Sequence, residues 1–242
     1  DGLYHAAEGK ARKLMDYDSR REVTSILVDE QSNHVYIAEN GGSVRILDRN
    51  TGRPLKTLVI PDHKDMPLTY TLFLDNRKRL WAYCEYGAQV YDTLSGNWLG
   101  PEILPTYNTN AVKAVNEDAN GDIWIGYDND GVEVKRSDGT KEFLRSDIND
   151  PHSLGNNSVE SIFYDPDGGM WVATYKRGVS VYYPSEYKFQ TYALGDVNCI
   201  VPVPGNGSKV YVGTDHGELM IFDLSTHQTV RIPVPGPYGK RA

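Results

Sequence analysis

Short stretches in which apolar and polar residues alternate recur along the whole chain. Two adjoining sets show the pattern best, residues 111–134 and residues 159–184, and both are rich in Val, Ile, Tyr and Trp. Turn residues that include Gly121 and Gly168 separate the stretches. Alternation with a period of two, bounded by Gly, Asn and Asp, is typical of strands joined in hairpins. The pattern therefore predicts antiparallel β-structure.

One aromatic residue in the second strand of each set gives the register of a repeat. This marker aromatic recurs with a period in the low forties of residues. It stands at Tyr36, Trp81, Trp124, Trp171 and Tyr211. Four short strands in a period of that length are typical of the blades of β-propellers. The predicted fold class is therefore all-β, a β-propeller of four-stranded antiparallel blades.

Five complete repeats and a partial one account for residues 1–242 as a single β-propeller domain or a fragment of one. The expected boundaries are a partial blade over 1–20 and complete blades over about 21–60, 66–104, 109–145, 157–193 and 195–233. The partial repeat holds two strands, and residues 233–242 are too few to supply its missing pair. Because an open ring leaves an edge and an apolar face bare, we expect part of a longer, seven-bladed type of propeller.

Neighbouring blades must share a core, since a single four-stranded blade cannot bury both of its faces. The marker aromatics are expected to fill that core. A glycine follows each marker and begins the third strand, where a side chain would crowd the next strand. These glycines are Gly42, Gly87, Gly131, Gly178 and Gly217.

The charge balance narrows the choice of partner. The chain has 25 Lys and Arg against 33 Asp and Glu, a formal net charge of -8, so it has no diffuse positive field for nucleic acid or anionic lipid. Its apolar runs are far shorter than the roughly 20 residues that cross a bilayer. We therefore expect no nucleic-acid partner and no membrane contact by this region. Cys84 and Cys199 lie three repeats apart and are expected to be free thiols.

One connection between repeats and the blades on either side of it carry a more specific pattern. The connection, residues 149–159, reads Asn-Asp-Pro-His-Ser-Leu-Gly-Asn-Asn-Ser-Val, and the blade cores are residues 121–134 and 168–192. These segments resemble the two-component regulator propeller repeats of bacterial hybrid sensor kinases. Elsewhere Gln-Ser-Asn at 31–33 and Lys-Arg at 78–79 replace that family's Asp-x-x-Gly hairpin turn.

The resemblance implies a function that composition does not show. It implies a periplasmic sensor region, placed before a membrane helix and cytoplasmic histidine kinase parts. The ligands of that family are often oligosaccharides from polysaccharide breakdown, bound without chemical change by a dimeric receptor. For this chain the resemblance implies a non-catalytic propeller without cofactor, a small-molecule or oligosaccharide ligand, and a homodimer.

The residues themselves show little sign of catalysis or of a metal. Residues 128–131, Asp-Asn-Asp-Gly, look like half a calcium loop but lack its flanking Asp and distal Glu, so a tight turn explains them. No two histidines have the spacing of a zinc-binding helix, and no nucleophile elbow or phosphate-binding loop occurs. A triad that converges only in space stays open. We predict no catalytic residue, metal or cofactor.

The candidate binding residues follow from propeller geometry. Loops between the second and third strands, together with the connections between blades, gather on one face around the central channel. In such loops tyrosine rings stack on pyranose faces, while carboxylates, amides and Arg hydrogen-bond hydroxyls. Tyr175-Lys176-Arg177 is the strongest candidate, since an aromatic beside two cations stands out among acidic loops. The full set is Glu39, Asn40, Glu85, Tyr86, Asp128, Asn129, Tyr175, Lys176, Arg177, Asp215 and His216.

Two other functions stay open. A metal-dependent lyase on a similar propeller, of the streptogramin-inactivating type, would bind a divalent ion at the loop face and turn over its ligand. A protein–protein interaction scaffold of the WD-repeat kind would need no small ligand. The Trp-Asp signature of WD repeats is absent, because Trp81 precedes Ala, Trp124 precedes Ile and Trp171 precedes Val.

Overall fold

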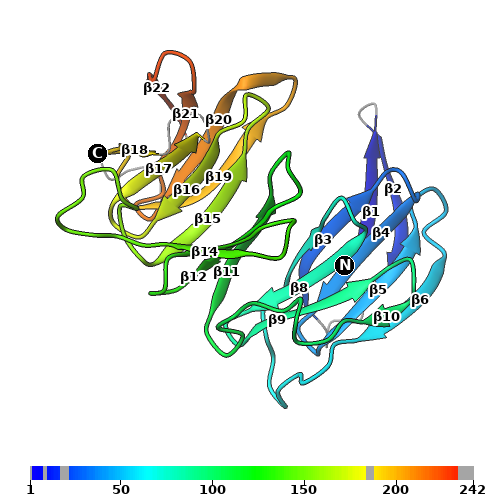
Figure 1. Cartoon of the computed structure of the whole chain (residues 1–242). Helices are drawn as coiled ribbons and strands as arrows, with labels where there is room; N and C mark the ends of the chain where they lie inside the picture. The colour runs from blue at the N-terminus through cyan, green and yellow to red at the C-terminus, as the bar shows by residue number, and fades with distance from the viewer. Residues whose placement is uncertain (1, 8–9, 17–21, 184–187, 234–242) are drawn as a thin grey trace. The chain divides into compact units, whose positions relative to one another are not determined.

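The computed structural model describes residues 2–7, 10–16, 22–183 and 188–233. Each complete repeat forms one four-stranded antiparallel sheet, and the partial repeat forms a two-stranded sheet (Figure 1). The all-β prediction and the four-stranded blades are thus confirmed. Residues 2–183 and 188–233, apart from the undescribed positions among them, contain no helix and hence none able to span a membrane. The expectations for Asp1 and for residues 234–242 lie outside the described residues.

The chain divides into two compact units, Asp1–Thr109 and Asn110–Ala242. In the first unit, the strands are β1 (Gly2–Ala7) and β2 (Lys10–Asp16), then blade 1 with β3 (Val23–Asp29), β4 (His34–Glu39), β5 (Ser43–Asp48) and β6 (Pro54–Val59), then blade 2 with β7 (Thr71–Leu74), β8 (Arg79–Cys84), β9 (Gly87–Asp92) and β10 (Asn97–Trp98).

The second unit holds three blades. Blade 3 has β11 (Val112–Glu117), β12 (Ile123–Tyr127), β13 (Val132–Lys135) and β14 (Lys141–Leu144); blade 4 has β15 (Val159–Tyr164), β16 (Met170–Thr174), β17 (Gly178–Tyr183) and β18 (Lys188–Tyr192); blade 5 has β19 (Val197–Val203), β20 (Asn206–Thr214), β21 (Leu219–Asp223) and β22 (Thr229–Ile232).

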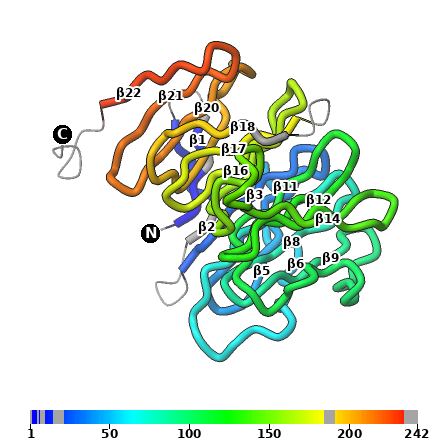
Figure 2. Tube along the Cα trace, turned by 60° about the vertical axis from the view of Figure 1, so that its left-hand side comes forward, coloured from blue at the N-terminus to red at the C-terminus, as the bar shows by residue number. Residues whose placement is uncertain are grey.

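Consecutive blades within a unit lie beside each other through their first strands. Strand β3 contacts β7 in the first unit, and β15 contacts both β11 and β19 in the second. The sheets of blades 4 and 5 are neighbours in both views of the chain (Figures 1 and 2). The starts of the first strands and the loops beside them are therefore brought together within each unit.

The marker aromatics occupy the cores in four of the five blades. Tyr36, Trp81, Trp124 and Trp171 are almost completely buried. The fifth, Tyr211, is only partly buried, and Phe222 fills the core of blade 5 instead, edge-to-face with Trp171 at 5.6 Å between ring centroids. Tyr211 lies in a cross-strand row with the exposed Val201 and Val230, so it faces away from the core that blade 5 shares with blade 4.

A buried aspartate holds each marker tryptophan. Asp165 accepts hydrogen bonds from the indole Nε1 of Trp171 and, at 2.7 Å, from the backbone N–H of Asp167 in the hairpin turn. A buried carboxylate needs such donors, because an unpaired charge in the interior is costly. The same arrangement joins Asp75 to Trp81 at 3.0 Å and Asp118 to Trp124 at 3.1 Å.

The turn glycines are required by space and by backbone conformation. Gly178 has φ 74°, and a Cβ there would lie 2.2 Å from the carbonyl oxygen of Tyr192. Gly87 has φ 107°, and its Cβ would lie 1.9 Å from the carbonyl oxygen of Asn108. In the two blades with altered hairpins, Asn33 (φ 59°) and Lys78 (φ 62°) adopt a left-handed conformation, so the turn survives the loss of its glycine.

The two cysteines are both free thiols, as expected. Cys84 is buried and Cys199 is exposed. Burial raises the pKa of the Cys84 thiol above its ordinary value.

Candidate functional site

The loop between the second and third strands lies beside the entry to the first strand of its own blade. In blades 1, 3, 4 and 5 the N–H of the residue after the second strand donates to the carbonyl just before the first strand. The pairs are Asn40 to Glu22 at 3.0 Å, Asp128 to Ala111 at 3.0 Å, Tyr175 to Ser158 at 2.9 Å and Asp215 to Asp196 at 3.0 Å. These hydrogen bonds bring each loop to the connection that enters its blade.

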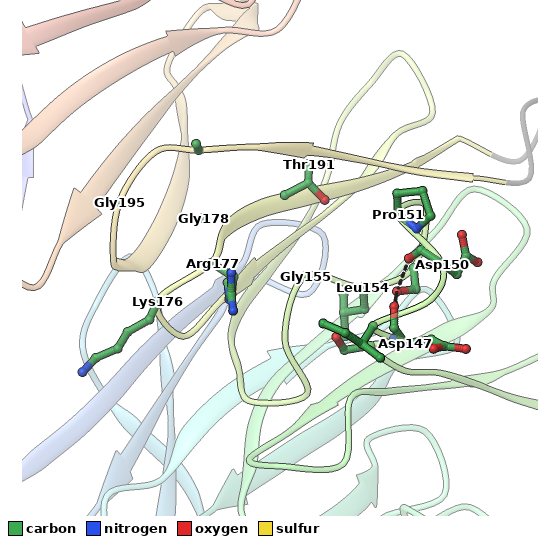
Figure 3. A pocket seen from close by; sticks show the side chains of 14 residues that line it. Asp147, Asp150, Pro151, Leu154, Gly155, Lys176, Arg177, Gly178, Thr191 and Gly195 are labelled. Carbon is green, nitrogen blue, oxygen red and sulfur yellow. Dashed lines mark hydrogen bonds between the residues drawn. The ribbon is translucent and has the colours of Figure 1, made fainter.

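At blade 4 this meeting encloses a cavity of about 550 Å³, here called the blade 4 cavity (Figure 3). Its walls come from three segments of the second unit. They are the connection over residues 146–155, the turn Lys176–Gly178 between β16 and β17, and the stretch from Thr191 to Gly195 at the end of β18.

The connection is held in one shape by its own polar side chains. Ser153 Oγ accepts from the N–H of Asp147 at 2.8 Å and lies 2.8 Å from the carbonyl oxygen of Asp150, to which it donates. Asp147 and Asp150 each accept the N–H two residues on, from Asn149 and His152, both at 2.9 Å. Such Asx turns fix a loop before any ligand arrives.

The same connection gives the cavity its apolar surface. Leu154 is buried in the core of blade 4 and anchors the end of the connection. Ile148, which is 95% exposed, and Pro151 also line the cavity. The wall therefore offers apolar contact next to the carboxylates of Asp147 and Asp150.

The opposite wall is cationic. Lys176 has φ 56° and Gly178 has φ 74°, and the buried Thr174 Oγ1 lies 3.4 Å from the carbonyl oxygen of Gly178 and closes the turn. The Lys176 ammonium lies 4.9 Å from the centre of the Tyr175 ring, a cation–π contact. A hydrogen bond to Tyr175, then the charges of Asp196 and Asp215, raise the pKa of Lys176.

Seven of the predicted residues lie along one rim of the second unit. Asn129 Oδ1 accepts from Ser158 Oγ at 3.0 Å, and Ser158 also accepts the N–H of Tyr175, which links the loops of blades 3 and 4. His216 Nε2 lies 3.9 Å from Asp196 Oδ2, and Asp196 also acts on Lys176. The rim carries Asp128, Asn129, Tyr175, Lys176, Arg177, Asp215 and His216.

Glu39 does not lie on a loop surface, which corrects its expected place. It ends β4, its side chain is 0% exposed, and it accepts hydrogen bonds from Ser43 Oγ at 2.6 Å and Arg45 Nε at 2.8 Å. Position 39 still belongs to a central strand, and Arg45 pairs with the buried carboxyl group there. Asn40 next to it is partly exposed.

Blade 2 has a smaller cavity of about 300 Å³ at the equivalent place, here called the blade 2 cavity. The connection over residues 61–70, the exposed Tyr86, the buried Cys84 and Asn108-Thr109 line it. Burial raises the pKa of Tyr70 to about 12, and its hydroxyl lies 3.0 Å from His63 Nδ1. Glu85 is exposed beside this cavity but does not line it.

Among the residues of the blade 4 cavity that escaped the sequence-based prediction are Asp147, Ile148, Asp150 and Thr191. Asp150 lies in the distinctive connection, which was a usable signal. Thr191 lies in the blade core over 168–192, whereas Asp147 and Ile148 lie outside any motif, and only the folded chain brings them to the turn at Lys176.

The residues that the structure describes contain no group of three His, Cys, Asp or Glu side chains placed to hold a metal ion. In the turn at 128–131, Asp130 Oδ2 accepts from Asn110 Nδ2 at 2.5 Å, and Gly131 has φ 74°. Turn geometry accounts for this segment.

Comparison with known families decides the type of repeat. A family model described as "Two component regulator propeller" matches residues 153–176. The chain carries a two-component regulator propeller repeat. The resemblance seen in the sequence is confirmed over this segment, which begins at Ser153 in the connection, runs through β15 and β16, and ends at Lys176. This two-component regulator propeller repeat thus supplies parts of two walls of the blade 4 cavity. No curated protein sequence matches the chain.

Solved structures show the same β-propeller fold at low identity. The extracellular domains of two hybrid two-component systems from B. thetaiotaomicron are 19% and 15% identical to the chain, with TM-scores of 0.64 and 0.66 over 86% and 96% of it. The WD40 repeats of RRP9 are 15% identical, with a TM-score of 0.68 over 95%. The chain spans 69% of that WD40 structure, but only 29% and 40% of the two extracellular domains.

Proposed function

We propose that the chain is the ligand-binding sensor propeller of a two-component signalling protein and that it binds an oligosaccharide at the blade 4 cavity without changing it. The observation that carries the proposal is the prefolded connection over residues 146–155, whose end begins the regulator propeller repeat and which meets Lys176 and Arg177 across a cavity of about 550 Å³. That volume lies within the range of roughly 300–1,000 Å³ for small-molecule sites.

The chemistry of the walls suits a sugar. Ser146 and Thr191 offer hydroxyls, Asp147 and Asp150 offer carboxylate acceptors, and Ile148 with Pro151 offers apolar contact. A saccharide presents both hydroxyl groups and C–H surface, so it can use every one of these groups.

The sensor role rests on the family repeat together with the fold. Two of the similar structures are extracellular domains of hybrid two-component systems. We place this chain outside the cytoplasm, in the periplasm, as the input region of a receptor that acts as a homodimer. The chemistry of signalling would then belong to other regions of the receptor, and this region would have no catalytic role.

The test is a thermal-shift screen of the purified chain against oligosaccharides from plant, host and microbial glycans. A ligand present at 100 times its Kd should stabilise the fold by about 2.7 kcal/mol and raise the midpoint. Calorimetry on each binder then gives the affinity. If divalent metal ions shift the midpoint and no glycan does, the lyase alternative replaces the proposal.

A matched pair of variants locates the binding. Ala193→Trp fills the blade 4 cavity, and Thr109→Trp fills the blade 2 cavity with the same side chain; both positions are exposed. Binding should be lost in Ala193→Trp and kept in Thr109→Trp. The reverse result would move the site to blade 2, and retention in both variants would remove it from either cavity.

A further inference from the structure

The charged residues of the blade 4 cavity divide into those whose side chains shape the backbone and those whose side chains do not. Asp147 and Asp150 are tied to their own connection, because each accepts a backbone N–H that shapes it. Turn formation therefore accounts for both carboxylates. No such role accounts for Lys176 and Arg177, since backbone groups and Thr174 close their turn.

The cations and carboxylates of this cavity also stay apart. Within the described part of the chain, Arg177 forms no ion pair, and neither do Asp147 and Asp150. Figure 3 shows Lys176 at one side of the cavity, the two aspartates at the other, and Arg177 between them. The negative charges of Asp196 and Asp215 in blade 5 act on the Lys176 ammonium. The charge of Arg177 is therefore less neutralised than that of Lys176.

The turn of blade 3 is a control within the same molecule. There Asn129 and Asp130 hold the places of Lys176 and Arg177, since each pair directly precedes the glycine, Gly131 or Gly178, with φ 74°. The blade 3 pair is engaged by the protein, because Asn129 bonds Ser158 and Asp130 bonds Asn110. The same backbone turn can thus be built without a cation.

Lys176 is also a costly choice at its position. Its φ of 56° is left-handed, a conformation that is unfavourable for most non-glycine residues and that Asn tolerates better. A chain with net charge -8 places two adjacent cations at this cavity, although Asn-Asp would serve the turn.

We infer that the Lys176–Arg177 side of the blade 4 cavity binds an acidic group of the ligand, a carboxylate or a sulfate ester, so that the sugar recognised is an acidic one. The inference rests on the proposed function. A guanidinium donates two parallel hydrogen bonds to a carboxylate or sulfate, and the ammonium beside it adds a point charge. Asp147 and Asp150 then face the hydroxyl groups at the other side of the ligand.

The experiment measures affinity by calorimetry for matched acidic and neutral saccharides. The probes are oligogalacturonides of two to six units with their neutral methyl esters, and sulfated with unsulfated N-acetyllactosamine, which is neutral. An acidic probe should bind, and its neutral match should bind at least about tenfold more weakly, as expected for the loss of hydrogen bonds to a charged group. Added NaCl should weaken the binding of the acidic probe and leave that of the neutral probe unchanged.

Grafting the blade 3 turn removes the cations and keeps the backbone. The double variant Lys176→Asn/Arg177→Asp should bind the acidic probe about 10- to 100-fold more weakly, with an unchanged melting temperature. Arg77→Gln, which removes an exposed cation outside both cavities, should leave the affinity unchanged.

The outcomes separate the two proposals. If neutral saccharides bind as well as acidic ones, or if the graft keeps full affinity, the acidic subsite is refuted and the sugar-binding function stands. If only other glycans of the wider screen bind and all of them are neutral, the acidic subsite is refuted as well. If no glycan binds, the proposed function itself fails.

Discussion

The cavities of blades 2 and 4 lie at equivalent places, yet their chemistry differs. Each lies where the connection entering a blade meets the turn between its second and third strands. The blade 2 cavity has a thiol and two tyrosines among its walls, Cys84, Tyr70 and Tyr86. The blade 4 cavity is larger and is lined by two cations, Lys176 and Arg177, and by two carboxylates, Asp147 and Asp150. The fold therefore sets where a cavity forms, and the residues of turn and connection set what it can bind.

The residues that support the two cavities correspond between blade 2 and blade 4. Asp75 with Trp81 in blade 2 matches Asp165 with Trp171 in blade 4, and Gly87 matches Gly178. Changes to these parts should affect both blades alike, whereas changes to the walls should affect one. Single substitutions can therefore test this difference between the supporting residues and the cavity walls. The largest effect on stability is expected for the buried tryptophans.

Removing either tryptophan should have the same large effect. We expect Trp81→Ala and Trp171→Ala each to lower the free energy of unfolding by about 3–5 kcal/mol, because each leaves a cavity and a buried aspartate without its indole donor. Urea denaturation measures both. Leu94→Ala, at a side chain 78% exposed, is the control and should change little. A large loss in only one blade would show that the two scaffolds are not equivalent.

Adding a methyl group at the turn glycines should also act on both blades. Gly87→Ala and Gly178→Ala should each cost about 2–4 kcal/mol, because the left-handed backbone penalty adds to a clash with a carbonyl oxygen. Gly139 has φ 90° and no atom within 4 Å of its Cβ position. Gly139→Ala should therefore lower the free energy of unfolding only by the backbone penalty, about 1–2 kcal/mol. Equal losses at all three positions would disprove the clash.

Alkaline pH should destabilise the blade 2 side through Tyr70. Burial raises the pKa of Tyr70 to about 12, whereas an unfolded tyrosine titrates near about 10. Between these values the unfolded chain loses a proton that the folded chain keeps, so the stabilisation is complete below the lower pKa and falls as the pH rises toward the upper one. Urea denaturation across this window measures the slope, which Tyr70→Phe should reduce. An identical slope in that variant would contradict the assignment.

The smallest effect concerns the thiols. An aromatic disulfide reagent should modify Cys199 rapidly and Cys84 slowly, because Cys84 is buried and its raised pKa keeps it protonated. The native chain should release one equivalent of chromophore quickly, and Cys199→Ser should abolish that phase. Rapid release of two equivalents would mean that the blade 2 cavity opens to the reagent.

The sequence was sufficient for features that depend on local pattern. Strand periodicity, the marker tryptophans and the glycines that begin third strands all recur at a regular spacing along the chain. Tyr175-Lys176-Arg177 stood out by the same comparison of repeats, since its composition differs from that of the matching loops.

Features that depend on neighbours in space could not be predicted. Glu39 is buried because it ends a central strand and because Arg45 pairs with it. Tyr211 is half-buried because it faces away from the core that Phe222 shares with Trp171. Asp147 joins the cavity only because Ser153 folds the connection toward the Lys176 turn. Each outcome depends on tertiary contacts that no spacing along the chain encodes.

The central claim is that ligand binds at blade 4, and hydrogen–deuterium exchange with and without a bound oligosaccharide tests it most directly. The account predicts slower exchange in peptides that cover residues 146–155 and 174–178, and unchanged exchange in peptides that cover 61–70 and 84–89. Protection confined to the second pair of segments, or absent from all four while calorimetry shows binding, would contradict the account.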